Sequence, residues 1–227
     1  MSILKMLVLV ILFVLLTPHA IQAQTASPAP ASTQVQYDAV KDFSITANPN
    51  GVWTYGWTSS LGSPLTPYAV TDTSSFPGTS FWFVVGNGGN GITPCVAHND
   101  TGVRICASDW CLPPNDLLLH PGPNGEYSVV RWTAPSSETI VIHGIFEGLV
   151  PLVPDGPTST DVHVLHNSSR SLLRGPINSY RQPLAFSGIL LRVAAGDTID
   201  FAVGFGSDGN YNGDSTGIRF VITRLWP

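Results

Sequence analysis

The chain has little charge of either sign. Only 11% of its 227 residues are Asp, Glu, Lys or Arg, and the formal net charge at pH 7 is −5. Beyond Lys5 the only lysine is Lys41. Binding to nucleic acid or to an anionic membrane depends on clustered Lys and Arg. We therefore expect neither of these partners.

Motifs of common catalytic chemistry are also scarce. The sequence contains no His-Glu-x-x-His zinc motif and no phosphate-binding P-loop. A glycosidase needs two carboxylates about 5–9.5 Å apart across a cleft, and spacing does not place Glu126, Glu138 or Glu147 in such a pair. We assign no catalytic residue and expect no enzymatic activity. A glycan-directed hydrolase remains a second alternative.

Cysteine is rare, with three residues at positions 95, 106 and 111. No Cys-x-x-Cys pair occurs, which argues against a cysteine-type zinc site. In an oxidising compartment one disulfide is expected. Cys95 and Cys106 flank a turn signal and are the favoured pair, while Cys106–Cys111 would close a small loop around Trp110. The odd cysteine, Cys111 in the favoured pairing, is either a free thiol or an intermolecular bridge that makes a dimer.

The N-terminus reads as an export signal. The apolar run Met6–Leu16 is shorter than the ~20 residues that span a bilayer, and the small residues of 20–23 suit signal cleavage. We expect a signal peptide over 1–23, a disordered Ala/Pro/Ser linker over 24–34 and a single domain over 35–227. The mature protein is expected to have no membrane span and to be secreted or periplasmic.

Short strand patterns separated by turn residues fill the rest of the chain. The turns carry pairs such as Asn50-Gly51 and Gly196-Asp197. Many short strands at this spacing predict an all-β fold, a two-sheet antiparallel β-sandwich of jelly-roll type. The predicted strands are 35–37, 43–47, 52–57, 80–85, 93–96, 103–107, 117–120, 127–132, 139–147, 161–166, 172–174, 184–193, 198–204 and 218–225.

Three segments resemble a known kind of domain: Phe43–Trp57, Leu117–Pro135 and Gly196–Gly204. Together they look like a secreted bacterial β-sandwich module found in PEP-CTERM (exosortase-sorted) and related surface proteins. The resemblance implies a jelly-roll fold similar to carbohydrate-binding modules, in a group whose functions are mostly unassigned. The chain ends at Arg224-Leu-Trp-Pro227 without a Pro-Glu-Pro signal, so secretion or periplasmic residence is expected rather than exosortase anchoring.

Aromatic residues are the first candidates for a binding surface. Trp53, Tyr55 and Trp57 alternate and share one face of a strand. That face either belongs to the core, where aromatic residues dominate, or stacks on sugar rings. Trp110 and Tyr211 lie in polar loops and are expected to be exposed.

The segment from Asp208 to Asp214 carries oxygen-bearing side chains at alternate positions, with Asn210 and Asn212 between the two acids. Calcium accepts such ligands, so calcium is a possible cofactor here. The twelfth position is Arg219, which excludes an EF-hand. The alternative is a turn whose side chains hydrogen-bond its own backbone.

These observations predict an exported, non-catalytic module that binds a neutral polysaccharide or surface glycan. A structural or adhesive protein that binds other proteins is the alternative. The predicted ligand-binding residues are Trp110, Tyr211, Asn210, Asp214, Trp53 and Trp57.

Overall fold

The computed structural model describes residues 34–85, 91–151 and 157–225. The predicted signal peptide and nearly all of the predicted linker lie outside these residues. The described residues contain no helix long and apolar enough to cross a membrane.

Sixteen strands make up the regular structure of the described residues. They are β1 (Gln36–Asp38), β2 (Trp53–Thr58), β3 (Thr66–Pro67), β4 (Val70–Asp72), β5 (Thr79–Phe83), β6 (Cys95–Asn99), β7 (Ile105–Cys106), β8 (Cys111–Leu112), β9 (Leu117–His120), β10 (Tyr127–Thr133), β11 (Glu138–Gly148), β12 (Thr160–His166), β13 (Arg170–Ile177), β14 (Pro183–Val193), β15 (Thr198–Gly204) and β16 (Thr216–Leu225).

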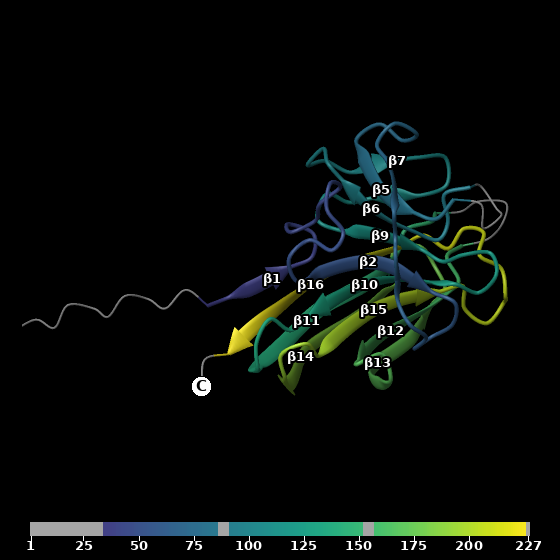
Figure 1. Ribbon diagram of the computed structural model, residues 1–227. Coiled ribbons are helices and arrows are strands. Elements are labelled where there is room, and N and C mark those ends of the chain that lie inside the picture. Colours follow the sequence, from purple (N-terminus) through teal and green to yellow (C-terminus); the bar gives the residue numbers. More distant parts are fainter. Residues whose placement is uncertain (1–33, 86–90, 152–156, 226–227) are drawn as a thin grey trace, which may run out of the picture. The chain divides into compact units, whose positions relative to one another are not determined.

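Two antiparallel sheets form a sandwich, so the predicted fold class is confirmed (Figure 1). The eight-stranded sheet runs in the order β14-β11-β16-β9-β6-β5-β4, and β1 also pairs with β16. The six-stranded sheet runs in the order β13-β12-β15-β10-β2-β3. The strands β7 and β8 form a separate two-stranded ribbon.

The main hydrophobic core lies between the two sheets. Phe201 of β15 stacks on Phe220 of β16 with ring centroids 3.5 Å apart. Trp53 of β2 meets Phe220 edge-on at 5.5 Å. Alternate residues of a strand point to one face, and Ile199, Phe201 and Val203 accordingly all enter this core with no exposed surface. Each such side chain contributes about 1.5–3 kcal/mol by leaving water.

A second, smaller apolar cluster lies on the outer face of the eight-stranded sheet. The same strands feed both cores: in β5, Trp82 points inward while Phe81 and Phe83 point outward. Burial on both faces explains why β5 is fully buried without alternation. The buried members of this outer cluster are Phe81, Phe83, Cys95, Ala97, Trp110, Leu112, Leu118, Leu149 and Val150.

A flap made of residues 100–112, which include the β7–β8 ribbon, supplies Trp110 and Leu112 to the outer cluster. The buried Asn99 side chain ties the flap to the sheet. Its Nδ2 donates to the Val103 carbonyl at 2.6 Å and to the Leu112 carbonyl at 3.0 Å. The backbone N–H of Cys111 donates to the Leu149 carbonyl at 3.1 Å.

The predicted strand over residues 43–47 is wrong. Ser44 Oγ accepts hydrogen bonds from the N–H groups of Thr46 and Ala47, both at 3.2 Å, which turns the chain. Side-chain to backbone bonds of this kind compete with strand pairing. The short strands β3, β4 and β8 carry no pattern long enough to recognise in the sequence.

Candidate functional site

The outer face of the six-stranded sheet carries a set of linked polar side chains. Along β12, Val162 and Val164 enter the core with no exposed surface, so Asp161 and His163 lie on the outer face. Register places His163 opposite Arg174 on the neighbouring strand β13. Three chemically different polar groups therefore meet at one place on this face.

The β2–β3 loop, residues 59–65, forms one wall of this region. Gly62 has a φ of 82°, and a Cβ atom at this position would lie 2.7 Å from the Ser168 carbonyl oxygen in the β12–β13 turn. Only glycine combines this backbone conformation with such a close approach. The loop and the turn are therefore packed directly against each other.

A charged network fixes the β12–β13 turn to the sheet. Arg131 of β10 donates from Nε and Nη2 to the two carboxylate oxygens of Asp200 on β15, at 2.6 and 2.8 Å. The Nη2 atom also donates to Ser168 Oγ at 2.7 Å. Ser168 Oγ in turn donates to Asp200 at 2.9 Å. Bidentate pairs of this kind fix orientation as well as supplying energy.

Two hollows adjoin on this face and share His163 and Arg174. We call them together the groove. The first hollow has a volume of about 360 Å³ and is lined by Leu61, Gly62, His163, Leu165, Ser168, Ser169, Ser171 and Arg174. The second has a volume of about 560 Å³ and is lined by Thr160, Asp161, His163, Arg174, Gly175, Pro176, Asn178, Gly206 and Ser207.

In the second hollow Asp161 is hydrogen-bonded to three neighbouring residues. Its Oδ2 atom accepts from the Tyr127 hydroxyl and is 2.7 Å from His163 Nε2, and its Oδ1 atom accepts from the Gly206 N–H at 2.9 Å. Burial acts to raise the pKa of Asp161, but the hydrogen bonds from His163, Tyr127 and Gly206 outweigh it and the net pKa is lowered. Burial and then the bond to Asp161 raise the pKa of Tyr127.

This arrangement determines which atoms face a ligand. An ionised carboxylate only accepts hydrogen bonds, so His163 carries its hydrogen on Nε2 and donates it to Asp161. In the neutral form of the ring Nδ1 is an acceptor, and Arg174 supplies donors. Such a mixed set of donors and acceptors suits the hydroxyl groups of a polar organic ligand.

The loop predicted as a possible calcium site lies next to the groove. Its Asp and Asn side chains form hydrogen bonds mainly within the loop itself. Asp208 Oδ1 accepts from the Asn210 N–H at 3.2 Å, and Asn210 Oδ1 accepts from Asn212 N and Nδ2 at 3.1 and 3.0 Å. In the described residues no three His, Cys, Asp or Glu side chains are placed to hold a metal ion. These bonds fit the alternative turn, and calcium stays a prediction that a calorimetric calcium titration tests.

Asp214 is the buried end of this loop. It has no exposed surface, and its Oδ1 atom accepts from Ser159 N and Oγ at 2.9 and 3.1 Å. Burial raises its pKa to about 7, against the lowering effect of the Ser159 bonds, and the negative charges of Asp208 and Asp161 raise it further. Asp214 therefore holds the loop from within, and its burial keeps it from contacting a ligand, contrary to the sequence prediction.

The aromatic residues predicted to bind ligand do not form an exposed platform. Trp53 is 1% exposed in the main core and Trp57 is half-buried against it. Trp110, predicted to be exposed, is 8% exposed because it packs in the outer cluster at 5.5 Å from Phe76. Tyr211 is half-buried, with its ring edge-on to His120 at 6.0 Å. Trp53 thus follows the core alternative and the expected exposure of Trp110 is wrong, while a ligand role for either stays an untested prediction.

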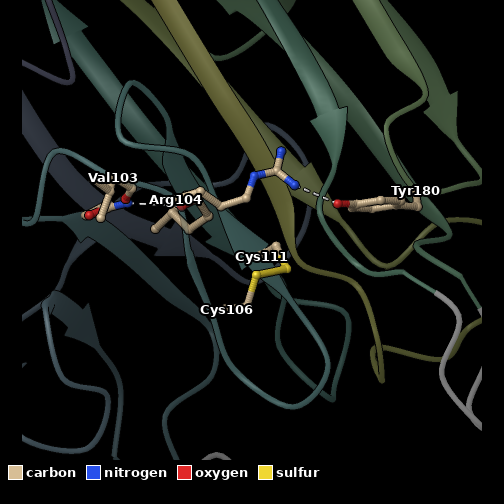
Figure 2. Close-up of a disulfide and its surroundings, with 7 residues drawn as sticks. Val103, Arg104, Cys106, Cys111 and Tyr180 are labelled. Carbon is tan, nitrogen blue, oxygen red and sulfur yellow. Dashed lines mark hydrogen bonds between the residues drawn. A yellow bond between two sulfur atoms is a disulfide. The ribbon is translucent and has the colours of Figure 1, made fainter.

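The disulfide also differs from the favoured prediction (Figure 2). Cys106 pairs with Cys111, since these residues face each other across the β7–β8 ribbon. Cys95 lies in β6 with 2% exposure and is the free cysteine. Arg104 beside the disulfide donates to the Tyr180 hydroxyl at 2.8 Å. A disulfide-linked dimer through the odd cysteine is disfavoured, because the buried Cys95 is that residue.

Two glycine patterns in the sequence match catalytic motifs but lack their context. Gly213–Gly217 fits Gly-x-Ser-x-Gly, yet Ser215 is 2% exposed, precedes strand β16 and has no histidine partner among the described residues. Gly204–Gly209 fits Gly-x-Gly-x-x-Gly, yet it leads into a loop and then β16 rather than a helix. Both motifs require a strand-to-helix turn, so neither indicates the corresponding function.

Sequence reasoning missed the groove. The alternation of Asp161 and His163 indicated that they share a face, but nothing local linked them to Tyr127 or Arg174. Those neighbours follow from strand register, with Tyr127 and Asp161 lying 34 residues apart.

No family model and no curated protein matches this chain, so the resemblance to the bacterial surface module stays a prediction. Solved structures give weak matches. A CBM51 module from Clostridium perfringens GH95, solved with methyl-galactose, is 8% identical over 70% of this chain and 94% of its own, with a TM-score of 0.34. A CBM4 structure is 14% identical over 69% and 93%, with a TM-score of 0.30. Pika GITRL is 20% identical over 43% and 72%, with a TM-score of 0.28. Scores this low carry no argument about function.

Proposed function

We propose that this protein is an exported module that binds a glycan in the groove, without turnover. The observation that carries the proposal is the meeting of Asp161, His163 and Arg174 on the outer face of the six-stranded sheet, where two hollows join. Sites of this kind combine a few well-placed polar groups with shaped surface.

The groove can contact both the hydroxyl groups and the C–H groups of a sugar ring. Nδ1 of His163, the hydroxyls of Ser169 and Ser171, and Arg174 can exchange hydrogen bonds with ring hydroxyls. Leu61 and Leu165 line the same hollow and offer apolar contact to C–H groups. This division between polar and apolar contacts supports a carbohydrate over a purely apolar ligand.

The hydrogen bonds that Asp161 accepts in the groove support binding without turnover. Asp161 accepts three hydrogen bonds, from Tyr127, His163 and Gly206. A carboxylate held in this way orients its neighbours and has little capacity left to act as a nucleophile or a proton donor. Asp161 therefore has a positioning role.

Action outside the cytoplasm is supported by the Cys106–Cys111 disulfide. Disulfides form and persist in oxidising compartments. This agrees with the export signal predicted over residues 1–23.

The test is binding of the intact mature protein to a panel of soluble polysaccharides by affinity electrophoresis and titration calorimetry. His163→Ala is expected to weaken binding by roughly 2- to 12-fold, the effect of one lost hydrogen bond of about 0.5–1.5 kcal/mol. His143→Ala is the control, because His143 lies exposed on β11 of the other sheet. Equal binding by both variants, or no binding to any polysaccharide, would overturn the proposal.

The structural or adhesive alternative is favoured by a different hollow. A cavity of about 440 Å³ lies on the outer face of the eight-stranded sheet, where Val40, Ile145 and Val221 line it with Asp38 and Lys41. If this cavity carries the function, Val221→Asp abolishes capture of a protein partner, and polysaccharide binding is absent in the unmodified chain.

A further inference from the structure

We propose that the first hollow of the groove, between Leu61 and Arg174, is a subsite for the anionic group of an acidic glycan, with Arg174 as the recognising residue. This inference rests on the proposed function and specifies its ligand class. The low charge of the whole chain predicts a neutral ligand, but the local charge of the hollow differs from that average.

The side chains that line the first hollow include a cation but no anion. Its lining includes one guanidinium, one imidazole, three serines and two leucines, and no carboxylate. Asp161 lines only the second hollow. Arg174 lines both hollows, so only in the first does a ligand meet the guanidinium without a carboxylate in the lining.

The acidic side chains on this face of the sheet already have partners. Asp161 accepts from Tyr127, His163 and the Gly206 N–H, and Asp200 is held bidentately by Arg131. In the part of the chain that the structure describes, Arg174 has no hydrogen bond or ion pair with either of them.

Arg174 differs in this respect from three other arginines and resembles Arg170 and Arg192, which also have no hydrogen bond or ion pair among the described residues. Arg131 is paired with Asp200, Arg219 with Asp116, and Arg104 with the Tyr180 hydroxyl. Arg174 is instead exposed at the junction of two hollows, opposite His163 on β12. An unpaired guanidinium at such a junction has its donors available for a ligand.

The chemistry that fits these donors is a planar or tetrahedral oxyanion. Arginine presents a rigid fork of N–H groups that matches carboxylate, and it also binds sulfate-like oxygens. The hydroxyls of Ser169 and Ser171 are placed to contact the same sugar unit. Uronic acids and sulfated sugars share this anionic chemistry, and the experiment separates them.

The experiment measures binding of the mature protein to matched polymers by affinity electrophoresis and titration calorimetry. One pair is polygalacturonate and the same polymer after carboxyl reduction, and the other is dextran sulfate and dextran. We expect at least one acidic polymer to bind tenfold or more tightly than its neutral partner. Preference for polygalacturonate identifies a carboxylate subsite, and preference for dextran sulfate identifies a sulfate subsite.

Arg174→Gln is expected to remove that preference by weakening binding of the acidic polymer about tenfold, while weakening binding of the neutral polymer much less. Arg174→Lys retains the charge without the fork and should recover only part of the affinity. Arg192→Gln is the matched control, because Arg192 is also exposed but lies on β14 of the other sheet.

Each outcome decides between the two proposals. Binding of neutral polymers with equal or greater affinity, or unchanged preference in Arg174→Gln, overturns the acidic subsite and leaves glycan binding in place. Failure of every polymer to bind overturns the proposed function as well. Equal losses in Arg174→Gln and Arg192→Gln would show a non-specific charge effect and also overturn the subsite.

Discussion

The outer faces of the two sheets have opposite uses. On the eight-stranded sheet the outer face of β5, β6 and β9 is apolar and is covered by the flap, which creates a second core. On the six-stranded sheet the outer face carries the Arg131–Asp200 pair and the Asp161–His163 contact, and it remains open as the groove. One outer face thus contributes to stability, and the other stays open for the proposed recognition.

The difference shows how covering a sheet face changes what the strands can contain. Where the flap covers β5, both faces require apolar residues, and Phe81, Trp82 and Phe83 follow one another. Where no second layer exists, β12 alternates between core valines and polar Asp161 and His163. Substitutions under the flap should therefore reduce stability alone, and substitution of an exposed groove residue such as Arg174 should reduce binding alone.

The largest effect on the flap side is expected from Leu112→Ala. Leu112 has no exposed surface, and removing its side chain leaves a cavity that costs about 2–5 kcal/mol in the free energy of unfolding. Urea unfolding measures this loss. Val103→Ala in the same flap is the control, since Val103 is 63% exposed and its loss should stay within about 0.5 kcal/mol. Equal effects of both substitutions would contradict the outer core.

The disulfide comes next. Replacing Cys106 and Cys111 together with serine releases a loop of sequence separation 5, and chain entropy puts the cost at about 2 kcal/mol. Denaturant unfolding measures the cost, and glycan binding should not change because the groove lies on the other sheet. A loss of binding comparable to the loss of stability would show that the two outer faces are coupled.

A smaller effect with a defined pH dependence is expected from Asp161→Asn. Folding lowers the pKa of Asp161 below its ordinary value of 3.8. The ionised carboxylate therefore contributes stability that is fully present above pH 3.8. That contribution is lost as the pH falls through the folded pKa. The melting temperature of the variant should lie a few degrees below that of the unmodified chain at pH 7, and the gap should close in acid. A gap that stays constant from pH 7 to pH 2 would contradict the assigned pKa direction.

The smallest effect on stability is expected from Arg174→Gln. Arg174 is exposed and has no partner among the described residues, so the free energy of unfolding should change by less than about 0.5 kcal/mol. Urea unfolding beside the binding measurements checks this. A large loss of stability would mean that Arg174 supports the sheet, and the contrast between the two outer faces would weaken.

The fold could be predicted because its signals are local. Turn pairs and the alternation of Thr198–Gly204 give strand position and facing directly from neighbouring residues. The Phe43–Ala47 segment failed because the Ser44 hydroxyl turned the backbone against its strand propensity.

The groove could not be predicted because its parts come together through register. His163 meets Arg174 across two strands, and the groove wall depends on Gly62 lying against Ser168, 106 residues further along the chain. The burial of Trp110 had the same cause. Polar neighbours along the sequence suggested exposure, but the flap folds Trp110 onto Phe76.

The position of Cys95 makes this thiol a natural reporter of flap motion. Its side chain is sealed in the outer cluster at 2% exposure, and burial raises its pKa to about 12. An alkylating reagent reaches the sulfur only when the outer cluster, to which the flap contributes Trp110 and Leu112, opens. The labelling rate of the unmodified protein therefore measures how often this cover opens, with no engineered label.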